Sequence, residues 1–163
     1  MKIKINYGLK AICVLKSDKV NGVITITDNN YKSVIEGNIT GLTPNQKHAL
    51  HIHEYGDLTD GCNSACAHYN PFNRNHGDRT SVERHVGDLG NIQADEHGNC
   101  IFQFEDYLIK LSGETSVIGR SFIIHEDEDD LGFGGFSDSL KTGHAGKRLV
   151  CGVIGWKKFQ SII

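Results

Sequence analysis

Short runs of alternating or β-branched apolar residues recur along the chain, and none of them has the period of a long helix. Such runs are typical of β-strands, in which successive side chains point to opposite faces. About eight strands are predicted, at residues 11–16, 23–27, 34–39, 50–55, 91–94, 100–105, 118–125 and 148–155. The stretch DEHGN at 95–99 is a hairpin signal between two of them. We therefore expect an all-β chain built as an antiparallel sandwich or barrel.

Two stretches interrupt this rhythm, at residues 56–88 and 126–147. Both are too long for hairpin loops, and both are rich in Gly, Asp, Asn and His. Connections of this length without secondary structure of their own are usually functional or disordered. We therefore expect two long functional loops, the second of which opens with the acidic run EDEDD.

The predicted strand at 50–55 carries an unusual pair of side chains. Leu50 and Ile52 point to one face, while His51, His53 and Tyr55 point to the other. A lone His-x-His pair is weak evidence of metal binding. The pair gains weight only if further ligand types converge on the same face.

Further ligand types do follow along the chain, with the spacing H-x7-H-x8-H-x2-D and then a histidine at the end of a later strand. They are His68, His76, His85, Asp88 and His125. Each histidine alone could simply be solvated, but their conjunction with the strand pair favours a metal centre. Zinc takes imidazole and carboxylate in tetrahedral sites, and copper takes imidazole in more tetragonal ones. The residues alone therefore leave the choice of metal open.

Length, charge and cysteine content narrow the class of protein. A chain of 163 residues suits one domain, 1–163, and its net charge of −3 argues weakly against nucleic acid or an anionic membrane as partner. No apolar run approaches the ~18 residues of a membrane span, and the start MKIKINYGLK lacks an apolar signal core. We therefore expect a cytoplasmic protein, in which each of the five cysteines is by default a buried thiol.

Taken together, these motifs resemble those of the copper-zinc superoxide dismutases. The matching stretches are HIHEYGD, GCNSACAHYNP, RNHG, ERHVGDLGN, VIGRSFIIHEDEDDLG and SLKTGHAGKRLVCGVIG. The resemblance runs from about residue 11 to residue 155 with the spacing between motifs kept, so it is specific. Residues 1–9 lie outside it as an N-terminal extension of unknown role.

The resemblance implies an eight-stranded Greek-key barrel and an antioxidant enzyme that disproportionates superoxide. It implies one copper ion and one zinc ion per subunit. The implied copper ligands are His51, His53, His68 and His125. The implied zinc ligands are His68, His76, His85 and Asp88. His68 would bridge the two metals, whereas His48 and His97 are assigned to neither.

Further roles are implied for residues around the two metals. Asp129 would link His51 and His76 by hydrogen bonds. Arg148 would orient superoxide, and Lys141 and Thr142 would line its approach. The segment FGGFSDSL carries fewer acids than the family usually has there, and a histidine stands at 144, where an asparagine is common. Steering of the anion is therefore expected to differ in detail.

The resemblance also pairs two of the cysteines. Cys62 and Cys151 would form a disulfide within the subunit, which is unusual for a cytoplasmic protein. Cys66 stands where the family more often has a glycine or another small residue, and it could compete for Cys151. Cys13 and Cys100 match strand positions without an assigned role.

Superoxide is the implied substrate, and the implied protein partners are a second copy of the chain and a copper chaperone. Dimerisation would use the region around residues 153–156 and the strand before Gly119, with Trp156 in the interface. Two alternatives are a copper-delivery protein with a dismutase-like domain and a zinc-stabilised β-sandwich that only binds a partner. The first tends to lose copper ligands, all of which are present here, and the second has no need of His125 or Arg148.

Overall fold

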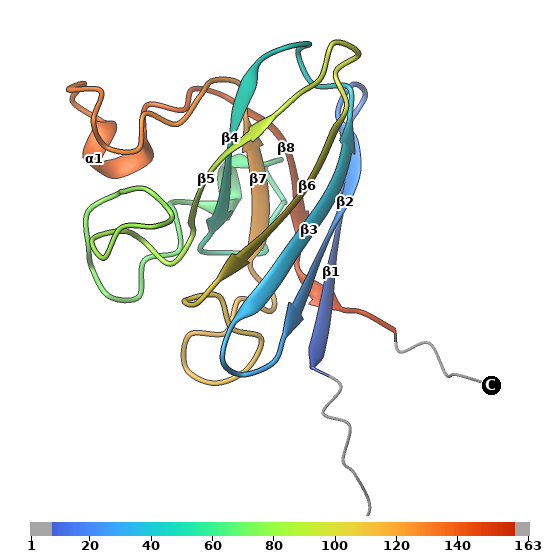
Figure 1. Ribbon diagram of the computed structural model, residues 1–163, viewed down its shortest axis with the longest axis vertical. Coiled ribbons are helices and arrows are strands. Elements are labelled where there is room, and N and C mark those ends of the chain that lie inside the picture. The colour runs from blue at the N-terminus through green and yellow to red at the C-terminus, as the bar shows by residue number, and fades with distance from the viewer. Residues whose placement is uncertain (1–7, 159–163) are drawn as a thin grey trace, which may run out of the picture.

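The computed structural model describes residues 8–158, in which two antiparallel sheets stack face to face (Figure 1). The first sheet has the order β6-β3-β2-β1-β9, with β1 (Leu9–Lys16), β2 (Asn21–Asp28), β3 (Ser33–Thr40), β6 (Cys100–Asp106) and β9 (Gly155–Trp156). The second has the order β5-β4-β7-β8, with β4 (Lys47–His53), β5 (Asp88–Gln93), β7 (Ser121–His125) and β8 (Arg148–Val153). The chain crosses between the sheets after β3, β5, β6 and β8, which is a Greek-key arrangement.

The hydrophobic core lies between the two sheets. In the first sheet it is built by the alternation of buried and exposed side chains along its strands. In β1 the side chains of Ala11, Cys13 and Leu15 are buried, and the residues between them are more exposed. The facing sheet contributes Ile52 and Phe122, which are fully buried. Burying a large apolar side chain stabilises the fold by roughly 1.5–3 kcal/mol, so this layer holds the sheets together.

Strands β4 and β7 differ because they are buried on both faces. One face packs on the core, and long connections cover the other. Figure 1 shows these connections, residues 54–87 in green and 126–147 in orange, beside the second sheet and away from the first. Within the described residues their only helical elements are η1 (Asn63–Ala65) and α1 (Ser139–Thr142). Side chains on this second face are thus shielded from water by loops.

All eight predicted strands form, with bounds that differ from the prediction by up to three residues. Two further differences concern the ends of the chain. The stretch 148–155 divides, because the main chain of Ile154 bonds to Gly119 and Arg120 and the next two residues pair with β1 in the other sheet. The first strand already begins at Leu9, within the stretch assigned to an extension. The rest of that stretch, residues 1–7, lies outside the described part of the chain.

The hairpin prediction at 95–99 is only half right. The turn forms, with the N–H of Gly98 bonded to the carbonyl of Asp95 and the Asp95 carboxylate accepting two further N–H groups. However, β5 before it and β6 after it belong to different sheets. The turn therefore acts as a corner between the layers, where Gly98 has a φ of 79° and packs against the main chain of Leu42.

Among residues 8–158, no helix has the length and apolar character needed to cross a membrane.

Candidate metal centre

Strand β4 places the histidine pair on the face that points away from the core. His51 and His53 are 0% and 1% exposed beneath the long connections, while Leu50 and Ile52 pack into the core. Tyr55 was expected on the same face, but the strand ends at His53 and Tyr55 is half exposed. A rigid strand thus holds two imidazoles side by side in a shielded space.

Two groups of side chains each bring their ligand atoms within 4.8 Å of one another. The first group is His51, His53, His68 and His125. The second group is His51, His68, His76 and Asp88. The first coincides with the copper ligands expected from the sequence, and the second shares three members with the expected zinc ligands. His51 and His68 belong to both groups, and His68 is the residue expected from the sequence to bridge the two metals.

The remaining expected zinc ligand, His85, lies beside the second group. Its Nδ1 is 3.0 Å from Asp88 Oδ1 and 3.3 Å from His68 Nδ1. The main-chain N–H of His85 also donates to Asp88 Oδ2 at 2.7 Å, which fixes the carboxylate. All seven side chains that the sequence analysis assigned to metals therefore lie together.

Several ring nitrogens in these groups fit a bound cation because no protein atom satisfies them. His51 Nδ1, His68 Nε2 and His76 Nδ1 are buried without a hydrogen-bond partner. His76 Nδ1 also lies 2.9 Å from Asp88 Oδ1 without forming a hydrogen bond. Buried polar atoms in proteins are normally bonded, so each orphan needs an explanation. Converging lone pairs on imidazole and carboxylate suit zinc and copper.

Burial keeps the imidazoles of the first group neutral. It lowers the pKa of His51, His53 and His68 below the ordinary value, and it lowers the pKa of His125 to about 4. Neighbouring imidazoles contribute in the same direction for His51, His53 and His125. A neutral imidazole offers the lone pair that a metal ion requires, so the site is prepared for a cation before one binds.

The buried carboxylate of Asp129, which belongs to neither group, connects a histidine of the first group to a histidine of the second. Asp129 Oδ2 lies 2.7 Å from His51 Nε2, and Asp129 Oδ1 lies 2.7 Å from His76 Nε2. These are the contacts expected from the sequence. A carboxylate behind a ligating imidazole fixes its tautomer and ring orientation. Here each bonded Nε2 leaves Nδ1 of the same ring directed at the metal groups.

Two other histidines are oriented by main-chain carbonyls. His53 Nδ1 donates to the carbonyl of Cys66 at 2.8 Å, and His125 Nδ1 donates to that of Gly146 at 3.3 Å. The two Nε2 atoms then face each other 3.3 Å apart. Because the protons sit on Nδ1, both Nε2 atoms present lone pairs to the same point.

Two residues of the site were missed from the sequence. His48 is fully buried, and its Nδ1 donates to the carbonyl of His125 at 2.9 Å. Asn91 exchanges two hydrogen bonds with the main chain of Asp129, at 2.7 and 2.9 Å. His48 shares the core-facing positions of β4 with Leu50, and a histidine on an apolar face is a signal that could have been followed.

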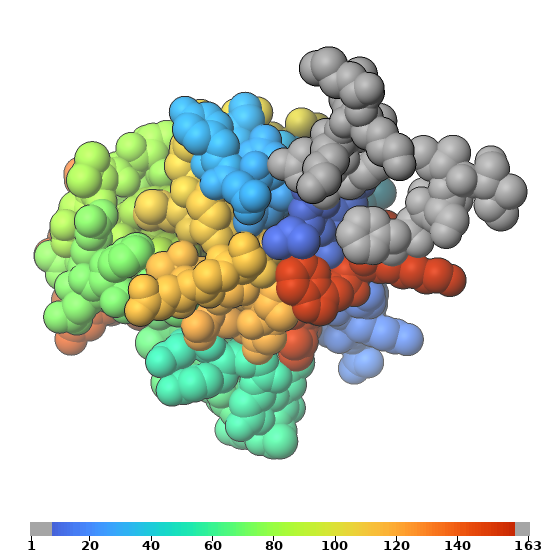
Figure 2. Space-filling view, turned by 90° about the horizontal axis from the view of Figure 1, so that it is seen from below, coloured from blue at the N-terminus to red at the C-terminus, as the bar shows by residue number. Residues whose placement is uncertain are grey.

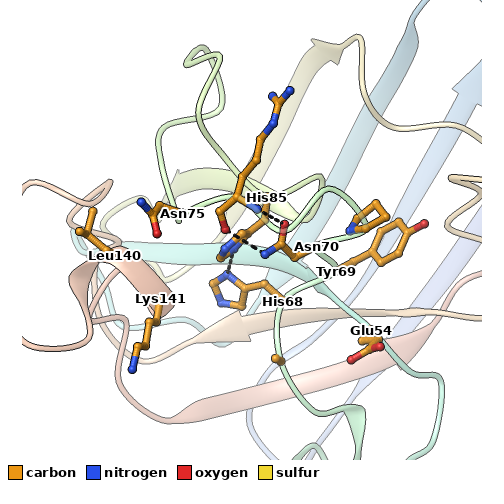
Figure 3. A pocket seen from close by; sticks show the side chains of 11 residues that line it. Glu54, His68, Tyr69, Asn70, Asn75, His85, Leu140 and Lys141 are labelled. Carbon is orange, nitrogen blue, oxygen red and sulfur yellow. Dashed lines mark hydrogen bonds between the residues drawn. The ribbon is translucent and has the colours of Figure 1, made fainter.

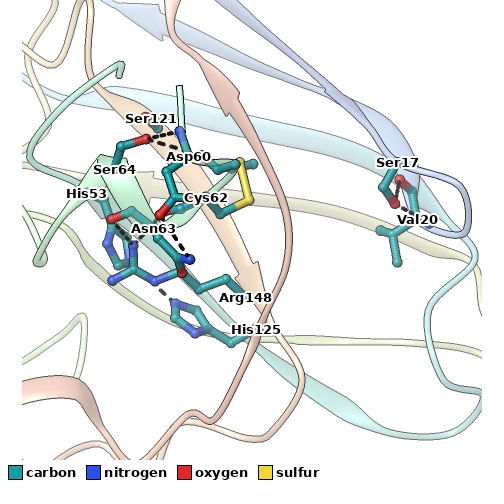
Figure 4. The surroundings of a disulfide bond; sticks show 12 residues. Ser17, Val20, His53, Asp60, Cys62, Asn63, Ser64, Ser121, His125 and Arg148 are labelled. Atoms are coloured by element: carbon teal, nitrogen blue, oxygen red, sulfur yellow. Dashed lines mark hydrogen bonds between the residues drawn. A yellow bond between two sulfur atoms is a disulfide. The ribbon is translucent and has the colours of Figure 1, made fainter. Parts of the chain in front are cut away.

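The predicted disulfide between Cys62 and Cys151 is present, with 5.7 Å between the Cα atoms, and Cys66 remains free. Arg148 lies beside it and donates from Nη1 to the carbonyl of Cys62 at 2.6 Å and from Nη2 to that of Cys66 (Figure 4). His125 and His53 lie next to this guanidinium in the same view. The disulfide-bonded loop thus holds the arginine close to the first metal group.

A pocket of about 440 Å³ opens onto the shared histidine (Figure 3). Lys141 and Leu140 stand on one side of it and Glu54 on the other, with His68 and His85 between them. Thr142 follows Lys141 on α1. The structure therefore places α1 at an opening that leads to the metal groups.

Comparison with known proteins agrees with this geometry. The profile of the copper/zinc superoxide dismutase (SODC) family matches residues 20–154. A superoxide dismutase [Cu-Zn] of Paramecium bursaria Chlorella virus 1 is 51% identical over 156 residues, covering 96% of this chain and 83% of that protein. Superoxide dismutase [Cu-Zn] A of Xenopus laevis is 52% identical over 150 residues, covering 91% and 98%.

A solved structure supports the same conclusion at the level of the fold. The structure titled "Crystal Structure Analysis of the clock protein EA4" superimposes with a TM-score of 0.89 at 42% identity, covering 96% of this chain and all of that one. Sequence and fold agree over nearly the whole length, and the two metal groups lie within the matched part. The chain belongs to the copper/zinc superoxide dismutase family.

Proposed function

We propose that this protein disproportionates superoxide, converting two superoxide anions and two protons into dioxygen and hydrogen peroxide. Membership of the family gives the reaction class. The observation that carries the proposal is the position of His68, which lies in both ligand groups with both ring nitrogens directed at them. His51 also lies in both groups, but its Nε2 is bonded to Asp129, so it has only Nδ1 to offer. A structural zinc protein needs one group only, whereas a redox site supported by a second metal needs two that touch.

The assignment of the metals follows the chemistry of each group. Copper would be held by His51, His53, His68 and His125, an all-imidazole set. Zinc would be held by His68, His76, His85 and Asp88, a set with one carboxylate. The orphaned Nε2 of His68 would face the first metal, and its Nδ1, 2.9 Å from Asp88 Oδ1, would face the second.

When bound, copper supplies the one-electron chemistry of both half-reactions, and zinc, which has no redox chemistry, supplies charge and rigidity. The chain itself handles protons and the anion. His68 Nε2 can hold a proton between the half-reactions, because its Nδ1 and the Asp88 carboxylate stay fixed in the second group. That proton would be one of the two needed for peroxide, and water would supply the other.

Arg148 would orient the incoming anion. Its guanidinium is fixed by the carbonyls of Cys62 and Cys66, which leaves a rigid positive charge next to the first group. Lys141, on the edge of the pocket, would add a second positive charge to the approach, and Thr142 would add a hydroxyl. A local positive field can attract an anion even on a chain of net charge −3.

We also propose that two copies associate through the end of the barrel around β8 and β9. Val153, Trp156 and Tyr55 are 42%, 55% and 50% exposed there, an apolar surface that a partner would cover. Figure 2 views this end, where the red C-terminal strands lie beside the orange segment before β7. Sedimentation of the wild type and of Val153→Asp tests this, and a monomeric wild type would reject it.

A cytoplasmic location and an antioxidant role complete the proposal. The three free cysteines are compatible with a reducing compartment, where unpaired thiols persist. Cell fractionation tests the location. Loading of the metal-free protein by copper salts alone, compared with loading in a cell extract, tests whether a copper chaperone is needed.

Metal analysis of His68→Ala, combined with a superoxide-consumption assay, tests the central claim. The wild type should contain one copper and one zinc per chain and consume superoxide. Because His68 lies in both groups, His68→Ala should lose activity and bind both metals more weakly. His97→Ala is the matched control, since that exposed histidine contacts only Glu96 at 3.4 Å.

Each alternative predicts a different outcome of the same experiment. Zinc alone, without activity after copper is added back, would identify a structural zinc protein. A full copper complement that passes to other proteins without superoxide consumption would identify a copper-delivery protein. A His68→Ala variant that loses one metal and keeps the other at full affinity would reject the shared ligand.

A further inference from the structure

His144 makes two close contacts on the segment that leads from α1 back to β8. Its ring stacks on Phe136, with 3.8 Å between ring centroids and 10° between planes. Its Nδ1 lies 2.7 Å from Asp138 Oδ1. The residue has a φ of 52°, in the left-handed region that non-glycine residues rarely occupy, Asn, Asp and His being the most frequent among them. His144 therefore makes both contacts from a main-chain conformation that few side chains tolerate.

Asp138 is the residue before α1, so the contact with His144 joins the two ends of that short helix. The Asp138 carbonyl accepts the N–H groups of Lys141 and Thr142 at 2.9 and 2.8 Å. Its carboxylate Oδ2 lies 3.2 Å from Thr142 Oγ1, while Oδ1 binds His144. A single turn of helix is marginal on its own, so a bond across it should limit its motion. Lys141 and Thr142 are the residues that this bond holds.

The charges around His144 are mostly negative. Asp138 is in contact with it, and the hydrogen bond from His144 lowers the pKa of Asp138 below its ordinary value. On the other side a pocket of about 470 Å³ is lined by Asp127, Glu128, Asp129, Asp130 and His144 itself. Lys141 is the nearby cation on α1. A protonated imidazole here would offset acidic charge next to the path of an anion.

We propose that His144 is a positioning residue for anion capture, which holds α1 by stacking on Phe136 and bonding Asp138, and so keeps that carboxylate engaged on the helix that carries Lys141. The inference rests on the proposed function, since it takes Lys141 as a guide for superoxide. Without the imidazole, Asp138 would lose this partner and α1 would be held less firmly, so capture of superoxide should slow.

Two substitutions at this position test these contacts. His144→Asn removes the ring but tolerates the left-handed backbone. His144→Arg keeps a flat group that can stack on Phe136 and bond Asp138. At one fixed pH we expect His144→Asn to lower kcat/KM roughly two-fold relative to the wild type, the effect of losing one exposed hydrogen-bonded contact. His144→Arg should keep kcat/KM close to the wild-type value.

The matched control is His97→Asn, the same chemical change at the exposed turn 95–99, which should keep the wild-type kcat/KM. Metal content is measured in every variant, so that loss of metal is not mistaken for slow capture. A His144→Asn variant with the kcat/KM of the wild type would reject the role of His144. So would a His144→Arg variant that behaves like His144→Asn.

Lys141→Gln separates this inference from the proposed function. If Lys141→Gln leaves the rate and its salt dependence unchanged, Lys141 does not guide the anion, and the proposed approach route is wrong. If Lys141→Gln slows capture while His144→Asn resembles the wild type, only the inference about His144 fails. Amide hydrogen exchange at 141–143 provides a further readout, with faster exchange expected in His144→Asn and wild-type protection in His144→Arg.

Discussion

Arg148 joins the disulfide to the anion-binding surface through one side chain. Its two donors to the carbonyls of Cys62 and Cys66 fix the plane of the guanidinium, so its remaining N–H groups can meet an anion without reorganisation. We expect Arg148→Ala to lower kcat/KM about 10- to 100-fold, the loss of one charged hydrogen bond of roughly 1.5–3 kcal/mol. The dependence of the rate on ionic strength should become flatter, because one positive charge is gone.

The measurement is stopped-flow superoxide consumption at several salt concentrations, with metal content checked. Arg148→Lys is the informative control, because it keeps the charge and loses the planar fork. Its salt dependence should resemble that of the wild type while its rate lies between the two. If Arg148→Ala retains both the rate and the salt response, Arg148 has no part in capture.

The backbone conformation of Cys66 could not be predicted from the sequence. It has φ 67° and ψ −138°, a region that usually requires glycine, so a small residue would suit this position better than a cysteine. The thiol is exposed and free, while the carbonyl carries the bonds to His53 and Arg148. The site therefore depends on the main chain at 66 and tolerates the side chain. The sequence showed a cysteine there, but its backbone conformation became visible only in the fold.

At the scale of elements, one buried ion pair fastens the long connection 54–87 to β6. Arg84 Nη2 lies 3.0 and 2.7 Å from the two oxygens of Asp106, and its Nη1 donates to the carbonyl of Asp88 at 2.6 Å. Both side chains are buried. The same arginine thus contacts the barrel and the start of β5, where a metal-binding carboxylate is held.

We predict that Asp106→Asn destabilises the metal-free protein by about 3 kcal/mol, because it leaves a buried guanidinium without its counter-charge. Zinc affinity should fall as well, since Arg84 also holds the main chain of Asp88. Urea unfolding and zinc titration measure the two effects. Glu105→Gln is the neighbouring control: it breaks the solvent-exposed pair with Lys32 and should change stability by less than about 1 kcal/mol. Equal effects of the two substitutions would contradict this account.

The strands themselves could be predicted from the sequence because alternation is a local property. The sheet that a strand joins depends on contacts distant in the sequence, and the prediction from the sequence was wrong in two places. The turn at 95–99 reads as a hairpin, yet β5 and β6 separate into different layers. The last strand reads as continuous, yet the chain changes sheets after Ile154. Both outcomes depend on hydrogen bonds to distant segments, which no local pattern encodes.

At the scale of the whole molecule, the seven candidate metal ligands could be proposed from the sequence, whereas the residues that orient them could not. These seven fall in recognisable motifs, and the structure brings them together. His48 and Asn91 act through partners 77 and 38 positions away along the chain. Such a contact exists only once the barrel has brought the segments together. Residues that orient ligands through main-chain groups therefore have to be found in the structure.

The buried imidazoles also make the stability of the metal-free protein depend on pH. Burial depresses the folded-state pKa of His51, His53, His68 and His125, the last to about 4, below the roughly 6.5 of an unfolded chain. Between these values the unfolded state binds more protons, so stability rises with pH. The stability that depends on these neutral histidines is fully present above about pH 6.5 and is lost as pH falls towards 4. In this range the free energy of unfolding falls by about 1.4 kcal/mol per pH unit for each proton that only the unfolded state binds.

His76 has the opposite effect on the pH dependence of stability. Its pKa is raised to about 9, because the hydrogen bond with Asp129 and the negative charge of Asp88 and Asp129 outweigh the effect of burial. Its contribution is present below about pH 6.5 and is lost as pH rises through 9. Several histidines have a lowered pKa and one, His76, has a clearly raised one. We therefore expect the Tm of metal-free, disulfide-intact protein to fall steeply from about pH 6.5 to pH 4 and to decline more gently above about pH 7.

Calorimetry of metal-free and metal-loaded protein across this pH range checks the prediction. Bound metal should raise Tm most near neutral pH and less at acid pH, because protons compete with the cation for the same nitrogens. His125→Asn in the metal-free state removes one histidine with a lowered pKa. The dependence of stability on pH below about 6.5 should then become shallower, by the equivalent of up to one bound proton. A metal-free Tm that stays constant between pH 6.5 and pH 4 would show that the histidine cluster is open to water, and the dry site inferred from its burial would then be wrong.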